Sequence, residues 1–574
     1  MYSKTQKKSH RTKNASQPKT PIPGHIQARL EKIWQQAYSA QTQEDLVQLY
    51  ADWSDSYDED HDAVGFFGHI SATSLLADLI DQPDDVCILD AGAGTGAAGV
   101  QLAKLGFENI VGIDLSADML AKAKEKNVYR KLLQADLGYP VDAFQNDSFD
   151  AAILVGVFSY GQAPAWSLDE IIRLVKPGGV VVFTMRTDFF ESDAMSVRSK
   201  MEELSEIEAW EEIQVTDPES YLPNKDPDAQ FRVWCFRVLE SNDSPDGEFV
   251  EAVKEAFSSE SPIKRFDHRH IWNSTASRLY NRYIECPEYY LNDSEEDILQ
   301  AYTGDIIGPE HHIVELGCGN ADKIKHLLEA FPNHKNGSDL IYSPIDLSPG
   351  AIEATQEEIE HHFGETVLVN PILASFDEAL SKMPKNHYKL ILFFGSSIGN
   401  LETIEETIDF LAMVRRHMSP GDRFLVGMDL HKPEEILHQA YQAGEPNRQF
   451  FLNIIRRMND ELGGEFDLDS FIQATSYDQG TPHKGIQDRC VNFKLVTQER
   501  QQTHLKEIDM QVELSPGEGV QVGISRKFCK KDIELLAAES GFELRRQWLD
   551  RHGYFSLNEL VPVHGNLVPV EESR

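Results

Sequence analysis

The chain has 574 residues, a hydrophobic content of 41% and a formal net charge of −40 at pH 7. This length predicts more than one domain. Because a broadly acidic protein repels phosphate, we expect no nucleic-acid partner. No apolar run approaches the ~18–20 residues that cross a bilayer, so we also expect no membrane span.

The six cysteines are widely scattered, and no two of them have the CxxC spacing of a zinc or redox site. We therefore expect no metal site. Free thiols are typical of a reducing compartment, which favours a cytoplasmic protein.

The first 25 residues are basic, rich in Ser, Thr and Pro, and free of acidic residues. They lack the apolar core of a secretory signal, so we expect a disordered tail over residues 1–25. A first helix is predicted from residue 26, because Ile26, Leu30, Ile33 and Trp34 recur at helical spacing.

Predicted strands and helices alternate from residue 86 to about 185. The strands are "VCILDAG", "NIVGIDLS", "FDAAILVGVF" and "GGVVVFTMR", and the helices between them are "GAAGVQLAKLG", "ADMLAKAKEK" and "LDEIIRLV". Such alternation predicts right-handed βαβ units and a doubly wound parallel sheet with helices on both faces. We expect this first domain over residues 26–240.

A glycine-rich loop follows the first of these strands, where Asp90, Gly92, Gly94 and Gly96 form the pattern D-x-G-x-G-x-G. Glycine lets the backbone approach a ligand closely at the start of a helix. The second strand ends at Asp114, whose carboxylate can accept hydrogen bonds from both hydroxyls of a ribose.

Asp136 comes after a third strand, where it can meet an adenine amino group. Dinucleotide enzymes share the ribose acid, but they usually carry G-x-G-x-x-G, which this loop lacks. The loop is instead similar to that of class I methyltransferases, which use S-adenosylmethionine (SAM). In "YADWSDSYDED", Trp53 and Tyr57 stand where such enzymes close an aromatic lid over the ligand.

The stretch from about 46 to 190 resembles the Williams–Beuren-region methyltransferase-like family. This resemblance implies the fold and the cofactor, but no acceptor. From the class I methyltransferase pattern described above, the cofactor contacts expected in the first domain are Tyr57, Asp90, Gly92, Gly94, Asp114 and Asp136.

The polar stretch "ESNDSPDGEF" is the best linker candidate, and we expect a linker over 241–262 and a second domain over 263–565. A second strand–helix series follows, with "HHIVELG", "YSPIDLS", "YKLILFFGSSIGN" and "DRFLVGMDL" as strands. The fold expected for the whole chain is therefore two tandem doubly wound, Rossmann-like domains.

The second domain repeats the loop. Glu315, Gly317 and Gly319 open it, Lys323 follows on the helix, and Asp346 ends the next strand as the ribose acid. The two glycines could simply make a tight turn, but the recurrence of the acid at the next strand end favours a ligand site.

From about 264 to 563 the chain resembles the ergothioneine-pathway histidine Nα-methyltransferases and their fungal relatives that act on tryptophan-type amines. The matching stretches include "CPEYYLNDSEEDIL", "VELGCGNADK", "FFGSSIGNL" and "AYQAGEPNRQFFLNIIRRMNDELGGEFDLDSF". The resemblance implies SAM as cofactor and a small-molecule amine or amino acid as methyl acceptor.

The same resemblance implies roles for individual residues. Cofactor contacts are expected from Gly317, Lys323, Asp346 and Phe376, and acceptor contacts from Tyr289, Asn400, Tyr441 and Ser525. Asn400 and Tyr441 should hold the acceptor's carboxylate, and Ser525 should lie at its side-chain end. The tyrosines could instead be ordinary half-buried aromatics, and Asn400 could cap a helix.

The sequence departs from this family at several positions. Gly523 stands where the histidine enzymes carry the Glu of E-x-S that grips the imidazole, Phe493 replaces a methionine, Trp272 a tyrosine, and Ser375 an acid before Phe376. Glycine at 523 is expected to leave room, so free histidine should be a poor acceptor and Gly523→Glu should improve its turnover.

No catalytic base is assigned. His387, His431 and His438 are expected to be surface residues. The function indicated is a SAM-dependent methyltransferase with two methyltransferase domains, of which the second N-methylates an amino acid or related amine. Three alternatives stay open. The second domain could be a histidine Nα-methyltransferase of ergothioneine-type biosynthesis, the first domain could be a non-catalytic SAM-binding module, and the chain could be a nucleotide-dependent oxidoreductase, which the loops disfavour.

Overall fold

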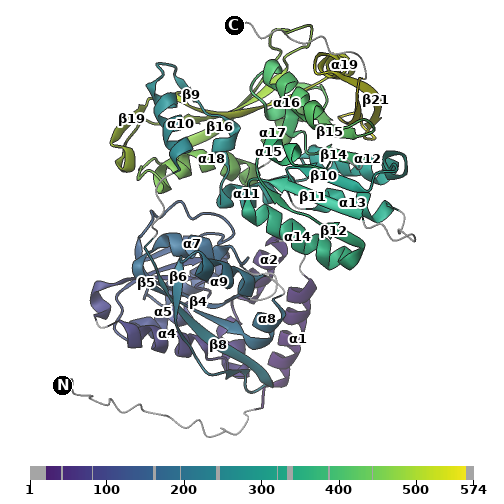
Figure 1. Cartoon of the computed structure of the whole chain (residues 1–574). Helices are drawn as coiled ribbons and strands as arrows, with labels where there is room; N and C mark the ends of the chain where they lie inside the picture. The colour runs from purple at the N-terminus through teal and green to yellow at the C-terminus, as the bar shows by residue number, and fades with distance from the viewer. Residues whose placement is uncertain are drawn as a thin grey trace, which may run out of the picture. The chain divides into compact units, whose positions relative to one another are not determined.

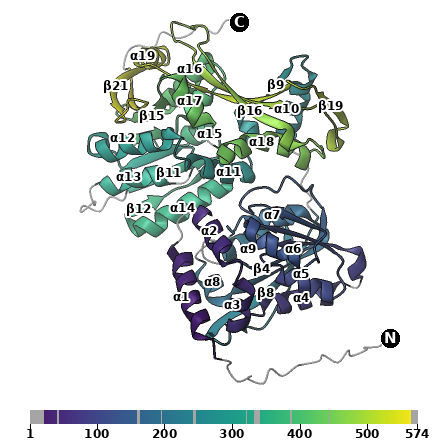
Figure 2. The same ribbon diagram turned by 180° about the vertical axis from the view of Figure 1, so that it is seen from behind.

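The computed structural model describes residues 21–39, 43–80, 82–158, 163–193, 196–240, 246–319, 321–331, 340–384, 388–442 and 444–563. The chain divides into two compact units, Met1–Asp243 and Ser244–Arg574 (Figure 1, Figure 2). Most of the predicted tail lies outside the described residues. The first helix, α1, spans Gly24–Ser39 and begins two residues earlier than predicted.

The N-terminal unit contains an eight-stranded sheet in the order β3-β2-β1-β4-β5-β8-β6, with β7 paired to β8. Strands β1 to β5 are parallel, as predicted, whereas β8 runs antiparallel to β5. The strands are β1 (Cys87–Ala91), β2 (Asn109–Asp114), β3 (Lys131–Gln134), β4 (Phe149–Phe158), β5 (Val175–Arg186), β6 (Trp210–Val215), β7 (Glu219–Leu222) and β8 (Asp226–Val238).

Helices cover both faces of this sheet, because successive side chains of a strand point to opposite faces. In β1, Ile88 belongs to the buried cluster that contains Leu76 and Leu102, whereas the next residue, Leu89, belongs to the cluster that contains Leu168. The helices are α2 (Gln43–Trp53), α3 (Tyr57–Val64), α4 (Gly68–Leu79), α5 (Ala97–Lys104), α6 (Ala117–Glu125), α7 (Ser167–Leu174), α8 (Thr187–Ser192) and α9 (Val197–Glu206).

The C-terminal unit repeats the same strand order, β12-β11-β10-β14-β15-β22-β21, with β13 paired to β11. Here too the core strands are parallel, and β22 is antiparallel to β15. The strands are β10 (His312–Leu316), β11 (Leu340–Asp346), β12 (Val367–Val369), β13 (Ile372–Leu373), β14 (Lys389–Phe393), β15 (Arg423–Asp429), β21 (Phe542–Leu549) and β22 (Phe555–Pro562).

A second sheet of this unit, in the order β16-β17-β20-β9, lies apart from the eight-stranded one (Figure 1). Its strands are β9 (Ile263–Arg265), β16 (Phe471–Asp478), β17 (Cys490–Thr497) and β20 (Gly519–Arg526), and β18 (Gln501–Leu505) pairs with β19 (Met510–Leu514). The helices of the unit are α10 (Gly247–Ser258), α11 (Ser274–Ile284), α12 (Tyr290–Ile306), α13 (Asp322–Ala330), α14 (Pro349–Phe363), α15 (Phe376–Ser381), α16 (Ile404–His417), α17 (Glu434–Tyr441), α18 (Gly444–Asp460) and α19 (Lys530–Glu539).

The two doubly wound sheets confirm the predicted fold class. The predicted linker over 241–262 is too long, however, because α10 occupies residues 247–258 and buries Phe249 and Val253. The apolar positions of this helix are spaced by four, which the polar residues just before it obscured.

Candidate functional site

The two glycine loops have nearly the same backbone conformation. Gly92 and Gly317 have φ values of +78° and +76°, and Gly94 and Gly319 have values of +53° and +55°. Such left-handed conformations favour glycine. A Cβ on Gly94 or Gly319 would meet no described atom within 4 Å, so the space in front of each loop is open to a ligand.

Each loop follows a buried acid that accepts a hydrogen bond from a tyrosine. Tyr129 donates to Asp90 over 2.6 Å, and Tyr342 donates to Glu315 over 2.5 Å. Burial raises the pKa of Asp90 to about 7 and that of Glu315 to about 8, although the tyrosine hydroxyl favours the charged form in both cases.

The predicted ribose acids also match. Asp114 Oδ1 accepts the backbone N–H of Ser116 over 2.9 Å, and Asp346 Oδ1 accepts that of Ser348 over the same distance. Asp114 Oδ2 accepts the backbone N–H of Gly94 over 2.7 Å, which fixes this carboxylate beside the glycine loop.

An apolar surface flanks Asp346. Leu347 is 73% exposed, and Leu373, whose Cα pairs with that of Asp346 across β11 and β13, is 57% exposed. A flat heterocyclic base would cover these side chains and remove them from water. The uncrowded glycine loop, the ribose acid Asp346 and the two exposed leucines therefore fit an adenosine-containing cofactor.

Helix α3 lies against the loop of the N-terminal unit. Thr95 donates to Asp58 over 2.5 Å, and Lys126 forms an ion pair with the same carboxylate. Tyr57 stacks on His61 with ring centroids 4.0 Å apart and meets Trp53 edge-on at 4.7 Å. The predicted lid residues Trp53 and Tyr57 are thus held together beside the loop.

Asp136 follows β3 and accepts the backbone N–H of Gly138 over 2.7 Å. Its contact with an adenine amino group stays a prediction.

Lys323 joins three elements around the second loop. Its ammonium lies 2.7 Å from Glu295 Oε2 on α12, and the same oxygen accepts the backbone N–H of Gly395 after β14 over 2.9 Å. Phe376 lies at Gly317, where its Cζ would be 3.9 Å from an added Cβ. The structure therefore brings all four predicted cofactor residues of this unit, with Asp346 at the end of β11, to the carboxyl ends of β10 and its neighbours.

Three of the predicted acceptor residues lie together as well. Tyr289 and Tyr441 meet edge-on with ring centroids 6.0 Å apart, and Tyr441 Oη lies 3.0 Å from Ser525 Oγ. Phe493 packs against Tyr441 at 5.0 Å. Asn400 is the last residue of the short helix η4 (Ser397–Asn400). The residue before it, Gly399, packs against the strand that contains Ser525, because a Cβ added to Gly399 would lie 3.0 Å from the backbone oxygen of Arg526.

A buried ionic cluster behind Tyr441 was not predicted from the sequence. Asp429 at the end of β15 forms ion pairs with Lys432 and Lys527, and all three side chains are at most 2% exposed. Tyr290 donates to Asp429 over 2.8 Å. Burial lowers the pKa of Lys432 to about 8 and also lowers the pKa of Lys527, while both ammoniums together hold the pKa of Asp429 below its usual value despite burial.

Gly523 does not leave room, which corrects the expectation above. Asn492 pairs with Ile524 and Lys494 with Gln521, so Val522 and Gly523 together oppose Phe493 in a β-bulge. Gly523 has φ +135°, and an added Cβ would lie 2.9 Å from His268 Cβ. The space that a glutamate would need is occupied by His268 on the short helix η2 (His268–Ile271).

Trp272 directly follows η2 and packs edge-on against Tyr280 at 5.2 Å and Phe450 at 5.3 Å.

His387, one of the three histidines considered above, lies outside the described residues. His431 is exposed and bonds Tyr477 at 2.7 Å, as expected of a surface residue, whereas His438 is half-buried between Thr475 and Glu434.

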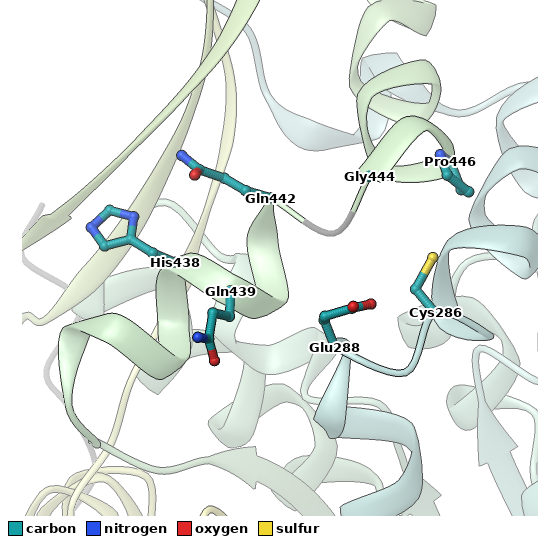
Figure 3. Close-up of a pocket in the computed structure, with 7 residues that line it drawn as sticks. All are labelled: Cys286, Glu288, His438, Gln439, Gln442, Gly444 and Pro446. Carbon is teal, nitrogen blue, oxygen red and sulfur yellow. The ribbon is translucent and has the colours of Figure 1, made fainter.

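A pocket of about 490 Å³ lies next to the acceptor residues in sequence but contains none of them. Helix α17 contributes one wall and the segment before α12 the other, where the carboxylate of Glu288 and the thiol of Cys286 are seen (Figure 3). It is lined by Cys286, Glu288, His438, Gln439, Gln442, Gly444 and Pro446. Neither glycine loop borders this pocket, so the candidate site is formed by the loops and the Tyr441–Ser525 pair.

Within the described ranges, no helix is long and apolar enough to span a bilayer. The same part of the chain contains no group of three His, Cys, Asp or Glu side chains that could hold a metal ion.

Comparison with protein families assigns both units. Residues 249–562 match the family model described as histidine-specific, SAM-dependent methyltransferase, and residues 89–183 match a general methyltransferase domain. Two relatives are similar to about half of the chain. Histidine Nα-methyltransferase of Mycobacterium tuberculosis is 29% identical over 291 residues, which is 50% of this chain and 87% of that protein. L-tryptophan methyltransferase of Psilocybe serbica is 23% identical over 324 residues, or 51% of this chain and 87% of that protein.

Human methyltransferase-like protein 27 is 32% identical over 148 residues, which is 25% of this chain and 60% of that protein. The histidine-specific family model covers more than half of the chain. The N-terminal unit adds a general methyltransferase domain, and the two glycine loops have matching geometry. The chain belongs to the family of histidine-specific, SAM-dependent methyltransferases.

Proposed function

We propose that the C-terminal unit transfers a methyl group from SAM to the α-amino group of an amino acid, and that the N-terminal unit is a second SAM-dependent methyltransferase. One observation carries this proposal for the C-terminal unit. The buried Tyr289–Tyr441–Ser525 group adjoins Asp429 at the end of β15, a strand parallel to β10, which leads into the glycine loop. Ligands of such sheets bind at the carboxyl ends of the strands.

The residues of this unit have separable roles. Gly317, Asp346 and Phe376 would hold SAM, which when bound supplies a methyl group that is already electrophilic on a sulfonium. The aromatic side chains of Tyr289, Tyr441 and Phe493 exclude water from the acceptor, and the protein accelerates transfer by orientation. An ammonium cannot attack, so the acceptor must first lose a proton to water or to the site.

The side-chain specificity is a separate part of the proposal. The two relatives above are named for histidine and for tryptophan, and this chain has glycine instead of a glutamate near the acceptor's side chain. We therefore propose an amino acid other than histidine as the preferred acceptor.

The N-terminal unit has a complete loop and lid, which supports an active enzyme over a docking module. The second candidate for this unit is a non-catalytic SAM-binding module.

The test uses the full chain with isotope-labelled SAM and a set of L-amino acids and amines, with products read by mass spectrometry. We expect N-methylation of at least one amino acid, and its loss in Asp346→Ala. The exposed change Glu353→Gln on α14 is the control. Absence of any N-methylated amine, or full activity in Asp346→Ala, would show that the proposed function is wrong.

A further inference from the structure

The cluster behind Tyr441 has a directional hydrogen-bond pattern. An ammonium has three N–H donors and no acceptor. In Lys527 all three are used: Nζ lies 2.7 Å from Asp429 Oδ2, 2.7 Å from Tyr441 Oη and 2.6 Å from Ser525 Oγ. Both hydroxyl oxygens therefore accept from the same ammonium.

This fixes where the hydroxyl protons can go. Tyr441 Oη and Ser525 Oγ are 3.0 Å apart, so one of them can donate to the other, but they cannot both do so. Tyr441 reaches Asp429 only over 3.5 Å, at the limit of a hydrogen bond. A ligand that accepts a proton from this pair therefore competes only with the long contact to Asp429, and the donating oxygen is one that a buried cation has made a better donor.

On the other side of Asp429, a second lysine and a second tyrosine form a closed set of hydrogen bonds with the same carboxylate. Lys432 donates to Tyr290 Oη over 2.5 Å, and Tyr290 in turn donates to Asp429 over 2.8 Å. Tyr290 thus donates its proton to Asp429 over a short distance, whereas Tyr441 reaches the same carboxylate only over 3.5 Å.

The charges of the cluster also favour an anion. Two ammoniums pair with the single carboxylate of Asp429, and the side chains of Asp429 and Lys527 are fully buried. Asp550 also acts electrostatically on Lys432, but its carboxylate accepts the backbone N–H groups of His552, Tyr554 and Phe555. The single carboxylate of Asp429 therefore does not fully balance the charge of Lys527. A buried excess of positive charge destabilises the protein, and an anion bound on the Tyr441 side would reduce this cost.

We infer that Lys527 is the positioning residue for the acceptor's carboxylate: by donating to both Tyr441 and Ser525, it turns a hydroxyl proton of that pair toward the acceptor and supplies the positive charge behind it. This inference rests on the proposed function of the C-terminal unit. The enzyme should then require a carboxylate and discriminate against decarboxylated amines.

The test compares kcat/KM for two pairs of acceptors, L-histidine with histamine and L-tryptophan with tryptamine, in the full chain. The wild type should prefer the amino acid of a pair. Lys527→Met should lower this preference roughly tenfold to hundredfold, because a hydrogen bond to a charged group is lost, with little change for the amine. A merely structural lysine would lower both rates together.

Lys432→Met is the matched control, since it also removes an ammonium from Asp429 but leaves Tyr441 and Ser525 untouched. Its preference should stay within about threefold of the wild type, a change below 1 kcal/mol. Equal loss of preference in both variants would overturn the inference. If Lys527→Met does not fold, Ser525→Ala decides: an unchanged preference in it overturns the inference.

Wild-type enzyme that methylates the amine as well as the amino acid would contradict the carboxylate site and leave amine N-methylation standing. If neither member of any pair, nor any other amine tested, is methylated, the proposed function itself fails.

Discussion

Tyr342 donates a hydrogen bond of 2.5 Å to Glu315, the penultimate residue of β10, just before the glycine loop. The N-terminal unit has the same pair, with Tyr129 and Asp90 at 2.6 Å. In both units the acid is buried, so the neutral form is favoured at a position where a bound SAM would bring a positive charge.

The stability of the C-terminal unit should fall as the pH rises toward 8. Burial raises the pKa of Glu315 to about 8 in the folded state, against about 4.3 in an unfolded chain. The folded state therefore holds the proton over this range. The stabilisation is complete below about pH 4 and is lost as the pH rises through about 8. Thermal melting at pH 5, 6, 7 and 8 should show a steeper decline for the wild type than for Glu315→Gln.

The control for this series is the exposed change Glu353→Gln, which should keep the wild-type slope. Parallel curves for the wild type and Glu315→Gln would mean that Glu315 is already ionised in the folded protein.

Substitution of Gly523 should damage the C-terminal unit rather than create a histidine site. An added Cβ meets His268 Cβ at 2.9 Å, and φ +135° is strained for any other residue. We expect Gly523→Ala to lower the free energy of unfolding by about 1–3 kcal/mol, and Gly523→Glu to lower histidine turnover. Denaturant unfolding and acceptor kinetics measure these two effects.

His268→Gly separates the steric contact from the backbone strain at Gly523, because it removes the Cβ of residue 268, which His268→Ala would keep. Combined with Gly523→Ala, it should recover the steric part of the loss and leave the part due to φ, which appears as a coupling energy in a double-mutant cycle. Strict additivity would exclude the contact with His268 as a cause.

Lys323→Met should destabilise the C-terminal unit even without cofactor. Glu295 is fully buried, and loss of the ammonium at 2.7 Å leaves its carboxylate unpaired, at a cost of about 3 kcal/mol or more. Adding Glu295→Gln should restore most of the melting temperature. SAM titration then reports the cofactor role alone, and normal SAM affinity in the double variant would remove Lys323 from the cofactor site.

Asn400→Ala and Tyr441→Phe should raise the acceptor KM or lower kcat/KM while SAM affinity is retained. Each removes one polar group of the acceptor site, for a loss of about 1–3 kcal/mol. Steady-state kinetics with an acceptor found in the screen of amino acids and amines, and calorimetry with SAM, check both parts. Wild-type kinetics in both variants would show that the acceptor lies elsewhere.

The parts of the site that lie on one short segment could be predicted from the sequence. Asp90 with its glycines, Glu315 with its glycines, and the ribose acids Asp114 and Asp346 each belong to a strand–turn–helix pattern whose geometry is local. Their predicted positions at the carboxyl ends of parallel strands agree with the structure.

The ionic cluster could not be predicted in this way. Asp429 in "VGMDL" and Lys527 in "ISRKF" are ordinary strand-end residues in sequence, and they meet only through packing between distant segments. The bulge at Gly523 was missed for a similar reason: the residue that fills its space, His268, lies in another segment of the chain. The linker was overestimated because polar residues before α10 masked its buried face.

The most direct test of the account is the number of SAM molecules that one chain binds. Calorimetric titration of the full chain should give a stoichiometry of two. Asp114→Ala and Asp346→Ala should each remove one site and leave the other unchanged, because distant sites usually act independently. A stoichiometry of one in the wild type would contradict the claim that both glycine loops hold the cofactor.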